Sequence, residues 1–151
     1  MRRSDREVTD QKEIDAILAE ARVCRVALAD GNGPYIVPIC FGYEPGNLYL
    51  HSALEGRKIA LIKTDPRCCF EVDLYDDLIR GERPCSWGVR YRSVIGFGTA
   101  TILTDPEEKK HGLSCILRQY DSGVHDFTSN EVQNVAVIRI AITSMTGKKR
   151  V

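Results

Sequence analysis

The sequence LYLHSALEGRKI, residues 48–59, joins the end of a strand pattern to the beginning of a helix. His51 follows the last apolar residue of the strand pattern, and Gly56 precedes Arg57 and Lys58, where apolar residues begin to recur at helical spacing. Cations and free N–H groups at a helix N-terminus attract phosphate, and glycine lets the backbone approach a ligand closely. The stretch therefore predicts a site for a phosphorylated ligand whose other end lies near His51.

The same residues fit other interpretations. Arg57 and Lys58 also suit a solvated helix face, which is what adjacent charges usually form. Ser52-x-x-Glu55 is a capping-box pattern, and such a box satisfies the first helical N–H groups without any ligand. If it forms, the two cations lie inside the helix and must reach back to a phosphate. His51 fits a packed residue at the end of a strand as well as a general acid.

Composition gives no reason to expect a nucleic-acid or membrane protein. Of the 151 residues, 21 are Lys or Arg and 21 are Asp or Glu, so no net charge attracts nucleic acid or an anionic membrane. The length fits a single domain, residues 1–151. The opening MRRSDREVTD lacks the apolar core of a signal peptide, and no apolar run is long enough to span a membrane. The six cysteines show no CxxC spacing, which favours reduced thiols in a cytoplasmic protein.

Apolar periodicity predicts about six strands and few helices. Helices are expected over residues 10–21, from the Arg57 region to just before Asp65-Pro66, and from 105 to about 120. Strands are expected over 23–29, 35–43, 48–50, 68–75, 91–103 and 135–142, with reversals at 30–33 and 44–47, a loop at 76–84 and a basic tail at 147–150. Gly96 and Gly98 suggest a bend or bulge. The pattern is typical of a small antiparallel barrel, closed or partly closed.

Pro38 lies in the middle of the expected strand 35–43. Proline cannot donate a ladder hydrogen bond, so this strand is expected at a sheet edge or interrupted at Pro38. An interruption would leave backbone groups free for a ligand, whereas an ordinary edge strand would not require one.

A second group of residues lies in CSWGVRYRSV, residues 85–94. Tyr91 and Ser93 share a strand face by period two, so both hydroxyls can meet one anion. Trp87, the single tryptophan, can cover a flat aromatic ligand. A core tryptophan flanked by exposed arginines explains the stretch equally well.

Other catalytic motifs are missing from the sequence. His111 and His125 show no metal-site spacing with each other or with His51, so no metal is expected. A serine-hydrolase elbow, GxGxxG and a P-loop lysine motif are also absent.

Three blocks resemble the pyridoxamine-phosphate oxidase-like, FMN-binding split-barrel family, and within it the nitroimidazole-resistance (Nim) branch. The blocks are YIVPICFGYEPGNLYLHSALEGRK (35–58), CCFEVD (68–73) and YRSVIGFGTATILTDPEEK (91–109). The resemblance runs from about Ile14 to Tyr120 and is weak in the C-terminal segment. It implies a mainly β fold, a six-stranded antiparallel split β-barrel with flanking helices.

The resemblance also implies a homodimer with two FMN sites at the subunit interface. Backbone groups on the first strand of the 35–58 block would line the isoalloxazine ring, and polar residues after the second would lie near it. The cations after Gly56 would bind the phosphate, and two aromatic residues, one just before the third block and one at its start, would close the pocket from the other subunit. The residues that line the ring would be Val37, Pro38 and Ile39, with His51 and Ser52 near it. The phosphate ligands would be Arg57 and Lys58, with Ser93 as a further candidate. Trp87 and Tyr91 would close the pocket.

The implied activity is that of an FMN-dependent oxidoreductase, nitroimidazole-reductase-like, which reduces a small electron-poor acceptor with NAD(P)H as a candidate donor. His51, whose ordinary pKa is near neutrality, is the candidate catalytic proton donor. The alternative is a non-catalytic flavin- or haem-binding protein, with His51 or His111 as an axial haem ligand. A nucleic-acid module, suggested by the basic residues 147–150 alone, ranks last.

Overall fold

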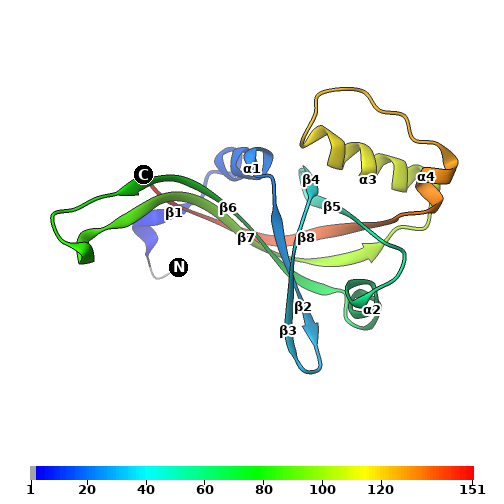
Figure 1. Ribbon diagram of the computed structural model, residues 1–151, viewed down its shortest axis with the longest axis horizontal. Coiled ribbons are helices and arrows are strands. Elements are labelled where there is room, and N and C mark those ends of the chain that lie inside the picture. The colour runs from blue at the N-terminus through cyan, green and yellow to red at the C-terminus, as the bar shows by residue number, and fades with distance from the viewer. Residues whose placement is uncertain (1–2) are drawn as a thin grey trace.

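The computed structural model describes residues 3–151, which form one curled antiparallel sheet with helices packed around it (Figure 1). The strand order is β3-β2-β6-β7-β8-β5-β4, and the short β1 pairs with β8. The strands are β1 (Glu7–Val8), β2 (Cys24–Asp30), β3 (Gly33–Ile39), β4 (Phe41–Glu44), β5 (Asn47–Ser52), β6 (Arg67–Ile79), β7 (Gly88–Ile102) and β8 (Ala136–Arg150). The helices are α1 (Gln11–Glu20), α2 (Arg57–Thr64), α3 (Pro106–Arg118) and α4 (Ser129–Gln133), with 3-10 turns η1 (Ser4–Arg6) and η2 (Pro84–Ser86).

The mainly β, split-barrel prediction is confirmed, although the described strands number eight rather than about six. The difference arises from the two-residue β1 and from the expected strand 35–43, which is two strands. The break falls at Cys40 and not at Pro38. Pro38 lies on β3, opposite Arg25 of β2. Because β3 is the strand at the end of the sheet, the predicted edge position of Pro38 is confirmed.

Helix boundaries follow local signals. Asp10 caps α1 by accepting a hydrogen bond from Lys12 N, and Asp105 caps α3 by accepting from the N–H groups of Glu107 and Glu108. The helix α2 ends at Thr64, directly before Asp65-Pro66, as expected. The short α4 was not predicted; Thr128 and Glu131 form its capping box.

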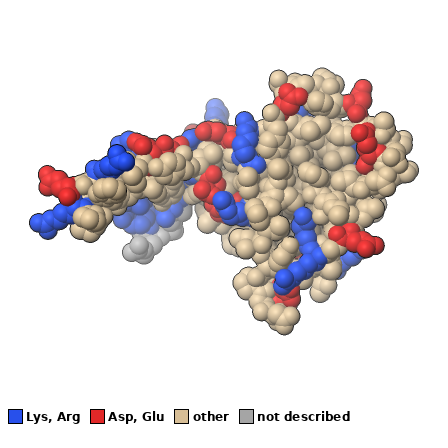
Figure 2. All heavy atoms as spheres, in the orientation of Figure 1, with Lys and Arg blue, Asp and Glu red and all other residues tan. Residues whose placement is uncertain are grey.

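The hairpin of β6 and β7 extends from the body as a long arm (Figure 1), and β8 pairs along β7 as far as the Tyr91–Arg150 pair. The expected loop 76–84 is wrong over its first half, because β6 continues to Ile79. The expected basic tail is wrong as well: Lys148 and Lys149 lie in β8, opposite Ser93 and Arg92 of β7. Side chains of both charge signs alternate along this arm (Figure 2).

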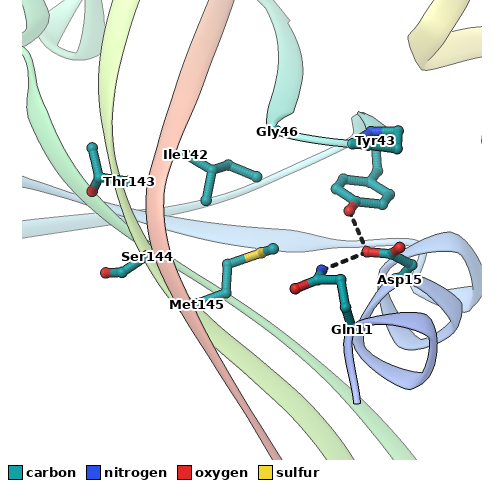
Figure 3. A pocket seen from close by; sticks show the side chains of 9 residues that line it. Gln11, Asp15, Tyr43, Gly46, Ile142, Thr143, Ser144 and Met145 are labelled. Atoms are coloured by element: carbon teal, nitrogen blue, oxygen red, sulfur yellow. Dashed lines mark hydrogen bonds between the residues drawn. The ribbon is translucent and has the colours of Figure 1, made fainter. Parts of the chain in front are cut away.

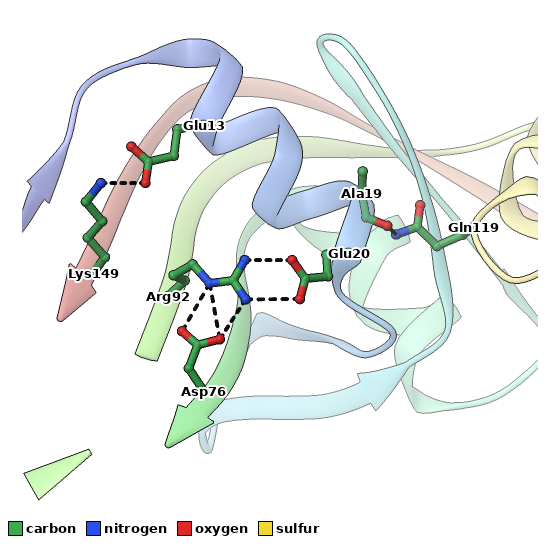
Figure 4. Close-up of polar contacts among 7 residues, drawn as sticks. All are labelled: Glu13, Ala19, Glu20, Asp76, Arg92, Gln119 and Lys149. Carbon is green, nitrogen blue, oxygen red and sulfur yellow. Dashed lines mark hydrogen bonds and ion pairs between the residues drawn. The ribbon is translucent and has the colours of Figure 1, made fainter. Parts of the chain in front are cut away.

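Polar contacts fix α1 against the sheet and α3 (Figure 4). Arg92 of β7 binds Glu20 and Asp76, with Nη1–Oε2 and Nη2–Oδ1 distances of 2.6 Å. Lys149 Nζ lies 2.6 Å from Glu13 Oε1. The buried Gln119 amide donates to the carbonyls of Leu18, Ala19 and Ala21 at 2.8, 3.0 and 2.8 Å, which satisfies carbonyls that the end of a helix leaves free.

The main core fills the inside of the curled sheet beneath α1 and α2, and a second cluster lies beneath α3 and α4. Gly96 is essential to the first, because a Cβ there would lie 2.2 Å from Cζ of the fully buried Phe70. The predicted irregularity near Gly98 is confirmed: the β7–β8 register shifts between Phe97 and Gly98.

Candidate functional site

The N-terminus of α2 is open. Gly56 occupies the cap position with φ 128° and ψ 174°, a conformation that side-chain-bearing residues rarely adopt, and no side chain caps the helix. The Ser52–Glu55 capping box does not form, because Ser52 is the last residue of β5 and pairs with Ala136. Arg57 and Lys58 are therefore the first two residues of the helix, where free N–H groups and the helix dipole favour an anion.

Arg57 is held by residues of the β2–β3 hairpin. Its Nε and Nη2 lie 3.0 and 2.6 Å from Asp30 Oδ2, and its guanidinium carbon lies 4.7 Å from the centre of the Tyr35 ring. The hydrogen bond from Arg57 lowers the pKa of the Asp30 carboxyl. Arg57 thus enters the site in a fixed direction, with three-fifths of its side chain still exposed.

Lys58 has no carboxylate partner within residues 3–151. Its side chain is half-buried, and desolvation lowers the pKa of its ammonium group. A cation that loses hydration without gaining an anion is unfavourable on its own, and a bound phosphate would supply the missing charge.

Val37, Pro38 and Ile39 lie on β3, whose second edge is unpaired because β3 ends the sheet. Alternate N–H and C=O groups of a terminal strand point away from its neighbour and are open to a ligand. The Ile39 side chain packs against the core, while Pro38 is exposed.

His51 lies on β5 opposite Val137, with its side chain exposed, and Ser52 follows it half-buried. Both are at the end of the strand that leads to α2, as the sequence predicted. The structure places them one short loop before Gly56.

The remaining predicted residues lie on the arm, away from α2 (Figure 1). Trp87 is half-exposed near the arm tip, and its Nε1 donates to Gly81 O at 3.0 Å, so a core tryptophan is excluded. Tyr91 lies 6.0 Å beneath the Lys148 ammonium, and Ser93 Oγ lies 3.5 Å from Lys148 O. One chain does not bring these residues to Arg57 and Lys58.

Two contributors to the site were not predicted, Asp30 and Tyr35. The turn DGNG signalled a reversal, but no local pattern indicates that its first residue contacts Arg57, 27 positions later. His111 has a polar partner outside this site. Its Nε2 lies 2.9 Å from Glu44 Oε2, and Tyr49 Oη donates to the other Glu44 oxygen at 2.7 Å.

Residues 3–151 contain neither a cluster of metal ligands nor a candidate membrane-spanning helix. No group of three or more His, Cys, Asp or Glu side chains is arranged to hold a metal ion. Over the same residues, no helix has the length and apolar character needed to cross a membrane.

The sequence model of the family described as pyridoxamine 5'-phosphate oxidase matches residues 10–149. A candidate 5-nitroimidazole antibiotic resistance protein from Bacteroides thetaiotaomicron is 35% identical with a TM-score of 0.86, over 95% of this chain and 86% of that chain. The flavocytochrome Anf3 from Azotobacter vinelandii is 22% identical with a TM-score of 0.88, over 100% of this chain and 72% of that chain.

An FAD-binding protein from Mesorhizobium loti is 25% identical with a TM-score of 0.71, over 97% of this chain and 98% of that chain. No curated protein matches. The family match and the 35% identity confirm the resemblance seen in the sequence blocks. The chain therefore belongs to the pyridoxamine 5'-phosphate oxidase family.

Proposed function

We propose that this protein is an FMN-dependent oxidoreductase that reduces a small electron-poor acceptor of the nitroimidazole type. The observation that carries the proposal is the open N-terminus of α2, where the half-buried Lys58 ammonium has no carboxylate partner among the described residues. Free N–H groups, Lys58 and the oriented Arg57 together form a site for a phosphate dianion.

The proposed site extends from this phosphate position along the edge of β3. The backbone of Val37, Pro38 and Ile39 would line the flavin ring, since this edge of the sheet is unpaired. Gly56 adds a reason for the fit: a Cβ at its position would meet nothing within 4 Å, so space remains beside the phosphate donors. Bound FMN supplies hydride or electron transfer, and the protein supplies orientation and charge.

His51 is the proposed proton donor to the reduced acceptor. Its imidazole is exposed at the end of β5, and histidine is the side chain that most often acts as a general acid. A His51→Gln variant should retain FMN but lose at least about tenfold in turnover, a typical contribution of general acid catalysis being about 10²–10⁴. Full turnover with bound FMN would eliminate this role.

A homodimer would complete the site. Four residues directly opposite one another form an apolar row on the outer face of the sheet, from Ile36 on β3 through Ala27 and Cys69 to Phe97 on β7. Ile36 and Phe97 are 61% and 56% exposed, and a hollow of about 320 Å³ adjoins Phe97 and Cys69. Such an exposed apolar face suits a second copy of the chain.

In that dimer the arm of each subunit would reach the other subunit's site. The arm carries Trp87, Tyr91 and Ser93 away from its own α2, with the Trp87 ring half-exposed. Trp87 would cover the flavin ring, and the hydroxyls of Tyr91 and Ser93 would face the ligand.

The second candidate is a flavin- or haem-binding protein without turnover, which the haem-containing Anf3 relative makes worth testing. His111 is a poor candidate for an axial ligand because Glu44 and Tyr49 already hold it. His51, which is exposed and has no side-chain hydrogen-bond partner among residues 3–151, is the better candidate.

The test is an absorption spectrum of the purified protein followed by titration with FMN and FAD. We expect a bound-flavin spectrum, tighter FMN than FAD binding, and anaerobic bleaching by NADH or NADPH. Lys58→Met should weaken FMN binding by about tenfold or more, whereas Lys63→Met, an exposed lysine in the last turn of the same helix, should not.

Three outcomes would contradict parts of the proposal. A bound flavin that no donor bleaches would favour the binding protein, and a haem band would favour haem handling. If FMN does not bind, or if the Lys58→Met and Lys63→Met variants bind FMN with equal affinity, Lys58 is part of a solvated helix face. The proposed function would then be wrong.

A further inference from the structure

A cavity of about 340 Å³ lies at the end of the barrel, where β8 separates from β5 and α1 covers the gap (Figure 3). The β5–β8 ladder ends at the pair Asn47 and Ala141, and Ile142 N then donates to Gly46 O at 2.9 Å. None of its nine lining residues belongs to the proposed flavin site; they are Gln11, Asp15, Tyr43, Pro45, Gly46, Ile142, Thr143, Ser144 and Met145. Its volume lies within the range of roughly 300–1,000 Å³ that is typical of small-molecule pockets.

The cavity contains a carboxylate with an incomplete set of partners. Tyr43 Oη and Gln11 Nε2 both donate to Oδ1 of Asp15, at 2.5 and 2.8 Å. Within residues 3–151, Oδ2 of Asp15 receives no hydrogen bond, and no Lys, Arg or His nitrogen lies within 4.0 Å of the carboxylate. Asp15 is half-buried, so its charge is balanced neither by a cation nor by full hydration.

The opposite wall of the cavity is apolar, and a bulge in β8 creates it. In a regular strand, neighbouring side chains alternate between the two faces. Here the register shift beside Phe97 and Gly98 inserts Thr143, so that Thr143 and Ser144 both point away while Ile142 and Met145 point toward α1 (Figure 3). The bulge therefore aims two apolar side chains at the Asp15 carboxylate.

We propose that this cavity is a second ligand site, which binds a small organic ammonium ion with an apolar body. The ammonium would donate to Asp15, the charge-assisted type of hydrogen bond. The apolar body would contact Ile142 and Met145, whose flexible thioether adapts to aromatic or alkyl groups. Tyr43 and Gln11 orient the carboxylate from the side and keep Oδ1 occupied, which leaves Oδ2 to the ligand.

The probe that tests the site is benzylamine, titrated into the 151-residue protein and followed through backbone amide shifts in nuclear magnetic resonance spectra. Benzyl alcohol, of the same shape but uncharged, is the control ligand. We expect benzylamine to shift the amides of Asp15, Gly46 and Met145 in a saturable manner, and benzyl alcohol to bind at least about tenfold more weakly.

The matched variant is Asp15→Asn. Asparagine keeps one carbonyl oxygen for Tyr43 and Gln11 and replaces the other oxygen by an amide donor, so the fold should persist while benzylamine binding weakens at least about tenfold. The control variant Asp126→Asn, in the exposed segment before α4, should leave benzylamine binding unchanged.

Two results would overturn the proposal: equal binding of benzylamine by the Asp15→Asn and wild-type proteins, or shifts confined to residues outside the cavity. FMN binding is measured in parallel on both variants. The ligand site and the flavin site share no residue, so failure of one leaves the other intact. An Asp15→Asn protein that no longer folds is replaced by Met145→Gln, which should weaken benzylamine through the apolar wall alone.

Discussion

Arg57 and Asp30 connect the first turn of α2 to the β2–β3 turn, with 2.6 Å between Nη2 and Oδ2. The pairing orients the guanidinium and also places a carboxylate beside the proposed phosphate position. We expect Asp30→Asn to tighten FMN binding by about two- to fivefold at low salt, because one repulsive charge is removed. Fluorescence titrations at two ionic strengths measure this. Weaker binding would show that orientation of Arg57 matters more than the repulsion.

Gly56 should be replaceable only at a cost to both fold and site. At φ 128° an alanine is strained by about 1–3 kcal/mol, although its Cβ meets no atom within 4 Å. Gly56→Ala should therefore lower the melting temperature and weaken FMN binding. Gly31→Ala is the control, since its Cβ also meets nothing and its φ is not positive. Equal melting temperatures for the two variants would refute the strain argument.

The Arg92 cluster predicts a pH-dependent stability. Hydrogen bonds from Arg92 lower the pKa of both Glu20 and Asp76 in the folded protein. The two ion pairs therefore contribute fully to the free energy of unfolding above the ordinary carboxyl pKa of about 4. This contribution is lost as the pH falls through the lowered pKa values of the folded protein. Arg92→Met should reduce the urea midpoint at pH 7, and the difference from wild type should shrink below pH 4. Arg90→Met, which removes an exposed pair 3.7 Å long, should show no such trend.

Gly96 and Phe70 should be energetically coupled. Because the Cβ of an alanine at position 96 would overlap the Phe70 ring, Gly96→Ala is expected to cost about 1–3 kcal/mol of unfolding free energy. In a Phe70→Leu background the same change should cost less. A double-mutant cycle by urea denaturation measures the coupling, and strict additivity would contradict the contact.

The apolar row on the outer sheet face predicts how the dimer can be disrupted. Phe97→Lys places a charge in the proposed interface, so sedimentation should show a monomer at concentrations where the wild type is a dimer. Val124→Lys, at a position 96% exposed in the segment before α4, should remain dimeric. A monomeric wild-type protein would remove the shared flavin site.

Local chemistry predicted the parts of the fold that depend on neighbouring residues. The Asp10 and Asp105 caps, the turn at Gly46 and the end of α2 before Pro66 all follow from a few adjacent side chains. The misses are set by distant partners. Asp76–Ile79 and Lys148–Arg150 are too polar to suggest strands, and they become strands because they pair with β7.

The site shows the same division. The adjacent residues Gly56, Arg57 and Lys58 could be recognised from the sequence, whereas the contacts of Arg57 with Asp30 and Tyr35 cross 27 and 22 positions. The Ser52–Glu55 pattern misled in the opposite direction. Its capping signal is genuine, but sheet pairing with Ala136 retains Ser52 in β5 and leaves the helix end open.

The prolines of β3 have a consequence for solubility. A terminal strand exposes unpaired backbone groups, which strands of other molecules can extend into fibrils. Pro34 and Pro38 both pair in register with β2, so the N–H that each lacks is missing from the open side. Aggregation by strand addition is thereby blocked at two positions, while carbonyl groups along the same edge stay accessible to a small flat molecule.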